Sequence, residues 1–515
     1  MPPNEPDLPE NNTIKDEGTE IIFALVGAVG TELELVTDTI KRELATFDYR
    51  SELIRISTDI IKNLVELPES NTPLEEINTY MSAGNKYRQL SGSNAALANA
   101  TAAEISNRRL KEKGKQIPLD KTAWIIRSLK HPEELETLRK IYGDGLFVVG
   151  VYSSKERREE YLSTKKRESD LEEAVESLIA RDADEGSISG HGQHTRDTFH
   201  LSDFFIELGQ SNDKLKNQIG RMLNLIFSNP YLTPTFDEFA MFMAFSASTR
   251  SADLSRQVGA VLSKNKSIIS TGANDVPAFG GGLYWPYYDN TDHSIKDVEL
   301  GRDYMRGEDS NKKSKIEITN QILKSFDDPV LRSKITEAIK NSRIDDLTEY
   351  GRVVHAEMEA ILACARTNNS TLETSLFCTT FPCHNCAKHI IAAGISRVIY
   401  VEPYPKSRAI EFHSDSISDS GGVEGKVTFE PFVGVGPRIF LNLFSNNLGS
   451  SEPLIRKNKS GEVVKWHPHS ATLRLSPRVL DYLGAELLAS ALAHREAQNY
   501  ENKNTIKVEI SEKSK

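Results

Sequence analysis

Residues 379–391, TTFPCHNCAKHII, hold two of the chain's four cysteines, two histidines and a proline. The Cys383-x-x-Cys386 pair fits three kinds of site: a closed structural zinc site, a disulfide-exchange site, and a metal site that performs chemistry. The first needs a fourth ligand, for which the nearby candidates are Cys378, His384 and His389. The second is disfavoured because no thioredoxin-type βαβ pattern surrounds the pair. The choice therefore depends on what else in the chain reaches the two cysteines.

A second motif, HAE at residues 355–357, supplies the missing partners. The run HAEMEAILACA predicts a helix that begins near His355, TSLFCTT predicts a strand, and CHNCAKHIIAAG predicts a second helix. Two helices on one side of a sheet can present their N-termini to a common point, where the helix dipole favours thiolates. His355, Cys383 and Cys386 then provide three ligands for tetrahedral Zn²⁺ and leave the fourth position for water.

Glu357 is predicted to be the catalytic residue that carries protons. Zinc lowers the pKa of a bound water molecule toward neutrality. A carboxylate beside the metal, but not bound to it, can move protons from that water to the base and then to the departing amine. The order H-x-E followed by P-C-x-x-C is the pattern of zinc nucleobase deaminases. The two remaining cysteines, Cys364 and Cys378, are predicted to be small buried residues.

Residues 250–277, RSADLSRQVGAVLSKNKSIISTGANDVP, precede these motifs and predict a β-hairpin that turns at Ser263–Lys266. Together with HAE and PCHNC, this segment resembles the deoxycytidylate deaminase branch of the cytidine deaminase superfamily. The resemblance implies an α/β/α sandwich and a sugar-binding asparagine at Asn274. Three basic residues near the motif segments are candidates for contacting the substrate phosphates: Arg250, Arg256 and Lys406.

The length of 515 residues predicts two or three domains. Residues 1–19 are predicted to be disordered, and residues 20–210 to form a parallel α/β domain similar to P-loop kinases. Residues 215–470 are assigned to the deaminase domain, with a polar insertion at about 285–350. Residues 471–515 are predicted to form a C-terminal helix and a charged tail.

The first predicted strand runs into a loop, residues 25–36, LVGAVGTELELV, that begins like a Walker A loop. Gly27, Gly30 and Thr31 are therefore candidate nucleotide-binding residues, but the loop has no lysine and places Glu32 near the expected phosphate. Three arginines lie where they could still contact an anion: Arg127, Arg157 and Arg158. A regulatory or assembly domain is favoured over a kinase.

The composition excludes several classes of protein. The formal net charge of −11 argues against broad, nonspecific binding to polynucleotides. No apolar run is long enough to predict a membrane span, and the acidic, Pro/Asn-rich N-terminus does not resemble a signal peptide. Four cysteines do not form a disulfide framework, so a reducing cytoplasm is expected.

The arrangement of the whole chain resembles the bacterial antiphage deoxycytidine nucleotide deaminases. The similarity includes residues 181–205, RDADEGSISGHGQHTRDTFHLSDFF, and residues 280–286, GGGLYWP. It implies conversion of dCTP or dCMP to the uracil nucleotide, depletion of the pool that phage replication needs, restraint by a small RNA, and a homo-oligomer.

Two other functions are compatible with parts of the sequence. The same zinc chemistry could act on a nucleoside or on a base flipped out of RNA, although the chain lacks a basic stretch interleaved with aromatic residues. A non-catalytic nucleotide- or RNA-binding scaffold is the other alternative. Glu357 argues against a scaffold, because a binding protein has no need of a proton carrier.

Overall fold

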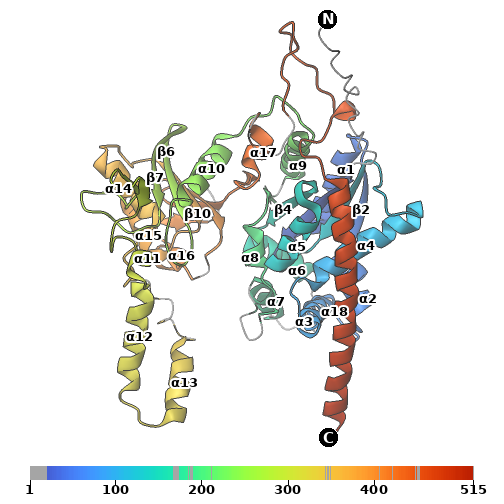
Figure 1. Cartoon of the computed structure of the whole chain (residues 1–515), viewed down its shortest axis with the longest axis horizontal. Coiled ribbons are helices and arrows are strands. Elements are labelled where there is room, and N and C mark those ends of the chain that lie inside the picture. The colour runs from blue at the N-terminus through green and yellow to red at the C-terminus, as the bar shows by residue number, and fades with distance from the viewer. Residues whose placement is uncertain are drawn as a thin grey trace, which may run out of the picture. The chain divides into compact units, whose positions relative to one another are not determined.

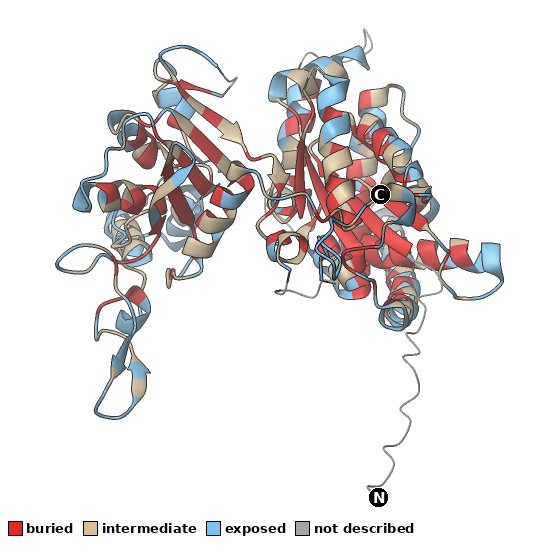
Figure 2. Cartoon of the chain, turned by 90° about the horizontal axis from the view of Figure 1, so that it is seen from above, coloured by how far each residue is buried: buried red, intermediate tan, exposed pale blue. Residues whose placement is uncertain are grey.

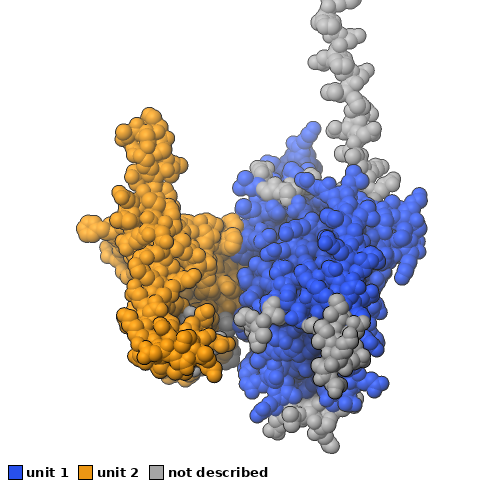
Figure 3. Space-filling view, turned by 60° about the horizontal axis from the view of Figure 1, so that its bottom comes forward, with its two compact units in different colours: residues 1–233, 433–515 blue, residues 234–432 orange. Residues whose placement is uncertain are grey.

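The chain forms two compact units, residues 1–233 with 433–515 (unit 1) and residues 234–432 (unit 2), coloured separately in Figure 3. The computed structural model describes residues 20–513 except 166–172, 184, 186–189, 210, 341, 343, 345–346, 348, 405, 420–421, 447 and 449–452. The predicted disorder of residues 1–19 thus lies outside the described residues. None of the helices in the described part of the chain is both long and apolar enough to cross a membrane.

Unit 1 contains a six-stranded sheet in the order β14-β5-β4-β1-β3-β2, parallel except for β14. Figure 1 labels β2 and β4 of this sheet. Its strands are β1 (Glu20–Gly27), β2 (Arg50–Arg55), β3 (Thr122–Arg127), β4 (Leu146–Tyr152), β5 (Phe204–Glu207) and β14 (Gly434–Val435). Its helices are α1 (Leu33–Ala45), the π-helix η1 (Ile56–Ile61), α2 (Lys62–Leu64), α3 (Pro73–Ser91), α4 (Ala96–Lys113), α5 (Pro132–Tyr142), the 3₁₀ turn η2 (Gly143–Gly145), α6 (Lys155–Thr164), α7 (Ala174–Ala183), α8 (Thr195–Phe199), α9 (Asn212–Ile226), α17 (Phe440–Phe444), the 3₁₀ turn η4 (Pro468–Ser470) and α18 (Val479–Lys513).

The central strand β1 explains why both faces of this sheet are covered. Its residues are buried throughout, and successive side chains point to opposite faces. Ile21, Phe23 and Leu25 belong to one apolar core with residues of α1 and α9. Ile22 and Ala24 belong to a second core with residues of α4, α5 and α18. The predicted first strand, which runs into the loop of residues 25–36, is therefore confirmed.

The unit boundaries differ from the predicted domain boundaries. Residues 212–233 and 433–515 belong to unit 1 together with the N-terminal sheet. The sequence instead assigns residues 215–470 to the deaminase domain. For α18, one reason is a buried ionic network: Arg109 on α4 pairs with Glu20 of β1 at 2.8 Å and with Glu486 of α18 at 2.5 Å. Removing either carboxylate would leave a buried guanidinium underpaired, so α18 is held against α4. The Arg109–Glu486 contact joins residues 377 positions apart, so no short sequence pattern predicts it.

Unit 2 contains a second six-stranded sheet in the order β12-β13-β11-β10-β6-β7. Strands β10 to β13 are parallel, and the β6–β7 hairpin is antiparallel at the edge. Its strands are β6 (Gly259–Lys264), β7 (Ser267–Ala273), β8 (Tyr287–Asp289), β9 (Ser294–Lys296), β10 (Ser375–Thr380), β11 (Arg397–Glu402), β12 (Ile417–Ser418) and β13 (Val427–Pro431). Its helices are α10 (Phe236–Ser248), α11 (Asp303–Arg306), α12 (Ser310–Leu323), α13 (Pro329–Lys340), α14 (Ala356–Arg366), α15 (His384–Ala392) and α16 (Ala409–Phe412).

The predicted hairpin is confirmed, and its turn is made by Asn265 and Lys266, both with positive φ. Positive φ at both central residues is the geometry of a type I′ turn, which matches the twist of the flanking strands. Figure 2 shows that buried residues concentrate on the strands and inner helix faces of each unit, whereas α12 and α13 are mostly exposed. The predicted polar insertion thus contains a small two-stranded sheet, β8–β9, and a pair of helices.

Candidate functional site

A residue of the predicted zinc site immediately precedes each of the helices α14 and α15. His355 is the residue immediately before α14, and Cys383 is the N-cap of α15. The Cys383 sulfur accepts a hydrogen bond from the Cys386 backbone N–H at 3.4 Å. Pro382 follows strand β10 and cannot donate to a sheet ladder, so the strand ends before the helix starts. Local sequence therefore sets both helix starts, and the sheet brings them together.

The three predicted ligands form one cluster. The Nδ1 atom of His355 lies 3.3 Å from the Cys383 sulfur and 3.4 Å from the Cys386 sulfur. Their ligand atoms all lie within 4.8 Å of one another, and no other such group of three occurs among the described residues. One imidazole and two thiols at this separation suit tetrahedral zinc with an open fourth position.

The other candidate ligands lie outside this cluster. Cys378 is wholly buried on β10, as is Cys364 on α14, which confirms both as buried thiols. The His384 ring packs edge-on against Phe412, with ring centroids 5.7 Å apart, and His389 is exposed on α15. A closed structural site would need one of these side chains, so the geometry favours the open site.

Hydrogen bonds among His355, Cys383 and Cys386 shift the pKa values of all three side chains. The pKa of Cys383 is lowered, first by its hydrogen bond with Cys386, while the same contact raises the pKa of Cys386 well above its usual value. The hydrogen bond with Cys383 raises the pKa of His355 to about 9. Zinc binding replaces such shared protons, because the metal requires thiolate and neutral imidazole ligands.

Glu357 lies in the first turn of α14 and lines the same pocket as His355 and Cys383. Its side chain is buried, with 5% of the residue exposed, and burial raises the pKa of its carboxyl group. The carboxyl group is not part of the ligand cluster. A buried acid next to a metal site, but separate from the ligands, is placed to take up and release protons.

Gly272 allows α14 to approach the sheet. A Cβ atom at this position of β7 would lie 2.1 Å from the carbonyl oxygen of Ala356 and 2.6 Å from the backbone nitrogen of Ala360. Both atoms belong to α14, the helix that carries Glu357. The close packing that positions the site therefore requires a residue without a side chain.

We expect Gly272→Ala to destabilise unit 2 by about 3 kcal/mol and to lower its zinc content, because α14 must shift to relieve the clash. Thermal unfolding and zinc content would measure the two effects. Gly484→Ala is the control, since nothing lies within 4 Å of a Cβ there and α18 is helical. That control should be neutral or slightly stabilising; a fully stable Gly272→Ala protein would contradict the packing argument.

A pocket of about 870 Å³ opens next to the ligand cluster. Of the predicted substrate-binding residues, Asn274, Arg256 and Lys406 line this pocket. Arg250 does not: its guanidinium stacks 3.6 Å from the centre of the Trp285 ring and donates to the Tyr284 carbonyl oxygen. The prediction that Arg250 contacts the substrate is therefore not supported, although Arg250 lies close to the hairpin in sequence.

The Asn274 amide has a structural role at the edge of the pocket. Its oxygen accepts a hydrogen bond from the Val258 N–H at 2.6 Å, and its nitrogen donates to the Arg256 carbonyl oxygen at 2.8 Å. These bonds hold the segment before β6 against the end of β7. Asn274 therefore fixes the backbone that carries Arg256, whose guanidinium lies 4.8 Å from the centre of the Tyr404 ring.

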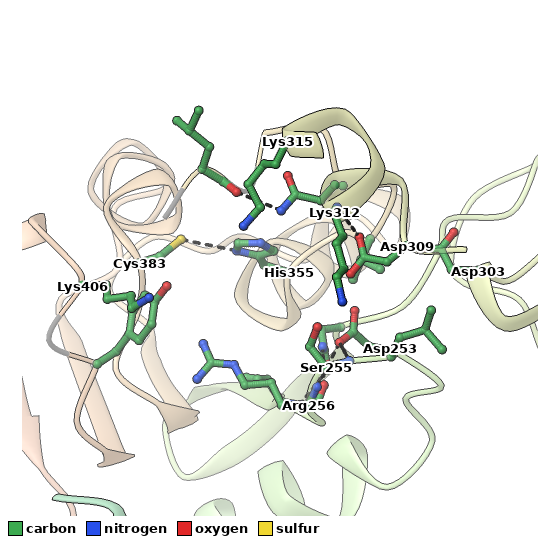
Figure 4. A pocket seen from close by; sticks show the side chains of 18 of the residues that line it. Asp253, Ser255, Arg256, Asp303, Asp309, Lys312, Lys315, His355, Cys383 and Lys406 are labelled. Atoms are coloured by element: carbon green, nitrogen blue, oxygen red, sulfur yellow. Dashed lines mark hydrogen bonds between the residues drawn. The ribbon is translucent and has the colours of Figure 1, made fainter. Parts of the chain in front are cut away.

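Sequence reasoning missed the lysines that the insertion brings to the pocket. Lys312 and Lys315 of α12 and Lys340 of α13 line it (Figure 4 shows the first two). The only available signal was the run NKKSKIE at residues 311–317, whose lysines at i and i+3 share a helix face. Charged residues on a helix usually lie on a solvent-exposed face. The pattern alone therefore did not show that these lysines line a pocket.

The glycine-rich loop lies in unit 1 and lines a separate hollow of about 250 Å³ with Gly27, Gly30 and Thr31. The Val29 N–H in this loop donates to the wholly buried carboxylate of Asp182 at 2.8 Å. Lys130 lies 2.7 Å from the same carboxylate and donates to the Gly27 carbonyl oxygen. The Asp182 carboxylate thus accepts from a backbone N–H of the glycine loop and pairs with Lys130, which follows β3.

The three arginines predicted to contact an anion near this loop have different surroundings. Arg157 pairs with Glu32 at 2.6 Å, so the acidic residue of the loop is already neutralised. Arg158 donates to the Ser153 carbonyl oxygen at 3.3 Å. Arg127 lines the hollow, and its Nη1 is buried without a hydrogen-bond partner among the described residues.

Comparison with known proteins agrees with the geometry of unit 2. The family model described as the cytidine and deoxycytidylate deaminase zinc-binding region matches residues 234–402. The chain is 31% identical over 182 residues to the deoxycytidylate deaminase of Enterobacteria phage T2, an alignment that covers 35% of this chain and 86% of the relative. The corresponding enzyme of Enterobacteria phage T4 is 30% identical over 185 residues, covering 35% of this chain and 84% of the relative.

Among solved structures, the dCMP deaminase from cyanophage S-TIM5 in complex with dCMP and dUMP is 22% identical, with a TM-score of 0.23. The match covers 39% of this chain and 100% of that protein. The alignments with the phage enzymes extend over most of their length, and the matched zinc-binding region contains the His355, Cys383 and Cys386 cluster. The chain therefore belongs to the deoxycytidylate deaminase family of the cytidine deaminase superfamily.

Proposed function

We propose that unit 2 catalyses the zinc-dependent hydrolytic deamination of deoxycytidine nucleotides, dCMP, dCTP or both, to the uracil nucleotide and ammonia. One observation carries the proposal: the buried acid Glu357 shares a pocket with a cluster of one histidine and two cysteines. The names of the related phage enzymes, both deoxycytidylate deaminases, support the choice of substrate.

The residues that would hold zinc are His355, Cys383 and Cys386, and the donor set fits that ion. When bound, zinc supplies a Lewis acid that makes water reactive at neutral pH. Glu357 takes a proton from the attacking water and passes it to the ring nitrogen N3. It then carries a second proton to the departing amine, so that water is added at C4 and ammonia leaves.

The substrate class is tested by incubating the purified chain separately with dCTP, dCMP, cytidine and a short RNA, and by measuring ammonia. Deoxycytidine nucleotides should release ammonia, whereas cytidine and RNA should release little. Release from RNA alone would show that the pocket accepts a flipped base, and release from none of the four would favour a binding protein.

For unit 1 we propose a P-loop-like regulatory domain without phosphoryl transfer. The parallel order β2-β3-β1-β4-β5 and the glycine loop after β1 support the P-loop-like part. The loop offers no lysine of its own, and Asp182 occupies its Val29 N–H. A phosphate would have to displace this carboxylate and meet the Glu32–Arg157 pair.

We therefore expect no hydrolysis of ATP or GTP by the full-length protein, measured as phosphate release. The reason is that the missing lysine would have stabilised the charge that develops on the transferred phosphoryl group. The deamination assay on the same sample is the control for intact protein. Turnover of either nucleotide would contradict the regulatory assignment and favour a kinase-like activity.

The remaining proposals rest on the sequence resemblance to antiphage deaminases. They are depletion of the dCTP pool during phage infection, restraint by a small RNA, and assembly into a homo-oligomer. A cytoplasmic location is also proposed; the free thiols of the four cysteines fit a reducing compartment.

A further inference from the structure

The helix pair α12–α13 presents a basic face to the catalytic pocket. Lys312, Lys315 and Thr319 all line the pocket and follow the spacing i, i+3 and i+7, which places them on one face of α12. Lys340 at the end of α13 joins them. Figure 4 shows Lys315 extending from α12 toward His355, and Lys312 extending from the same helix toward Asp253 and Ser255.

The base of this helix pair is anchored to the body of unit 2. Arg302, which is 5% exposed, forms ion pairs with Asp275 at 3.3 Å and with Asp297 at 2.9 Å. Asp275 directly follows Asn274 at the edge of the pocket. The Asp309 side chain then caps α12 by accepting a hydrogen bond from the Lys312 N–H at 2.9 Å. The basic face therefore starts from a fixed point next to the site.

The pocket is lined by both carboxylates and basic side chains. Each carboxylate that lines the pocket in the described part of the chain has a partner or a function: Asp253 accepts from two backbone N–H groups, Asp303 pairs with Arg352, Asp309 caps α12, and Glu357 is the proposed proton carrier. Among the described residues, the lysines and arginines that line the same space are Arg256, Lys312, Lys315, Lys340 and Lys406. Arg256 comes from the segment before β6 and Lys406 from the segment after β11, whereas Lys312, Lys315 and Lys340 come from the insertion.

We propose that Lys312, Lys315 and Lys340 bind the β- and γ-phosphates of dCTP, so that the α12–α13 pair selects triphosphates over monophosphates. This inference rests on the proposed deamination of deoxycytidine nucleotides. Arg256 and Lys406 serve the α-phosphate, which dCMP and dCTP share. The volume of about 870 Å³ is near the upper end of the usual range for small-molecule pockets, roughly 300–1,000 Å³, and leaves room beyond a base and sugar.

The test compares two full-length double variants of equal net charge. Lys312→Gln/Lys315→Gln removes two charges from the pocket. The control, Lys313→Gln/Lys334→Gln, removes two exposed lysines from α12 and α13 that do not line the pocket. Ammonia release from dCTP and dCMP is measured for both and for the wild type, and thermal unfolding checks that each variant is folded.

The pocket variant should lose about 10- to 100-fold in kcat/KM for dCTP, mainly through KM, because charge-assisted hydrogen bonds to the outer phosphates are lost. Its kcat/KM for dCMP should change by less than about threefold, since dCMP has no outer phosphates to bind. The control should keep both values. Equal losses for dCMP and dCTP, or no loss for dCTP, would overturn the inference, as would a wild-type protein that deaminates dCMP but not dCTP.

A binding measurement separates this inference from the proposed function. Calorimetric titration of dCTP and dCMP into the same proteins reports affinity without turnover. If no nucleotide releases ammonia, the proposed deamination fails, and the titration still decides the role of the lysines. Weaker dCTP binding by the pocket variant, with unchanged dCMP binding, supports it; unchanged dCTP binding overturns it.

Discussion

Glu357→Gln should lower kcat for deamination by about 10⁴-fold while zinc remains bound. The amide has nearly the shape of the carboxyl group but cannot take up a proton from water or return one to the amine. Because Glu357 is buried next to the ligand cluster and is not part of it, the metal should not depend on it. Ammonia release gives the activity, and elemental analysis of the purified protein gives the zinc content.

Glu359 offers a matched control on the same helix. It is also buried on α14, but it pairs with Arg366 and does not line the pocket. Glu359→Gln should lower the stability of the protein, because Arg366 loses its charged partner, yet the folded protein should keep its kcat. An active Glu357→Gln protein would exclude Glu357 as the proton carrier, whatever the identity of the substrate.

His355→Ala should lower the zinc content from about one ion per chain to nearly none and abolish deamination. The imidazole Nδ1 lies 3.3 and 3.4 Å from the two sulfurs, so its loss leaves two ligands, too few for a stable site. Unit 2 should also unfold at a lower temperature, because metal binding stabilises the folded state by mass action. Chelator treatment of the wild type should reproduce the loss of activity, and added Zn²⁺ should restore it.

Cys378→Ala is the control, because it removes a buried side chain near the site that is not one of the proposed ligands. Cys378 is buried on β10 outside the ligand cluster, so this variant should retain zinc and activity with only a small cost in stability. If His355→Ala retained a full complement of zinc, the three-ligand site would be wrong. A zinc site that included Cys378 would instead be revealed by zinc loss in the control.

Much of the catalytic centre could be predicted because its signals are local. The helix starts at His355 and Cys383, the strand between them, and the hairpin with its turn at Asn265–Lys266 each follow from short patterns of residues. The H-x-E and C-x-x-C spacings restrict which atoms can meet once the two helices lie on one sheet. These predictions required no knowledge of distant contacts.

Other features depended on contacts that short patterns do not encode. Arg250 lies close in sequence to the hairpin, yet its side chain stacks on Trp285 away from the pocket. The lysines of α12 and α13 lie far in sequence from the PCHNC motif, yet they line the pocket. Asp182 reaches the glycine loop from a position 153 residues away.

Short patterns in the sequence predicted the first strand of unit 1, the β6–β7 hairpin and strand β10 of unit 2, the helix starts next to His355 and Cys383, and the residues suited to zinc and to proton transfer. The tertiary structure was needed to show that residues 433–515 belong to unit 1, that Asp182 accepts a hydrogen bond from the glycine loop, and that lysines of the insertion line the pocket. The reason is physical. Periodicity and capping are set by neighbouring residues, whereas burial of a charge such as Arg109 is set by which distant partners, Glu20 and Glu486, compensate for its lost hydration.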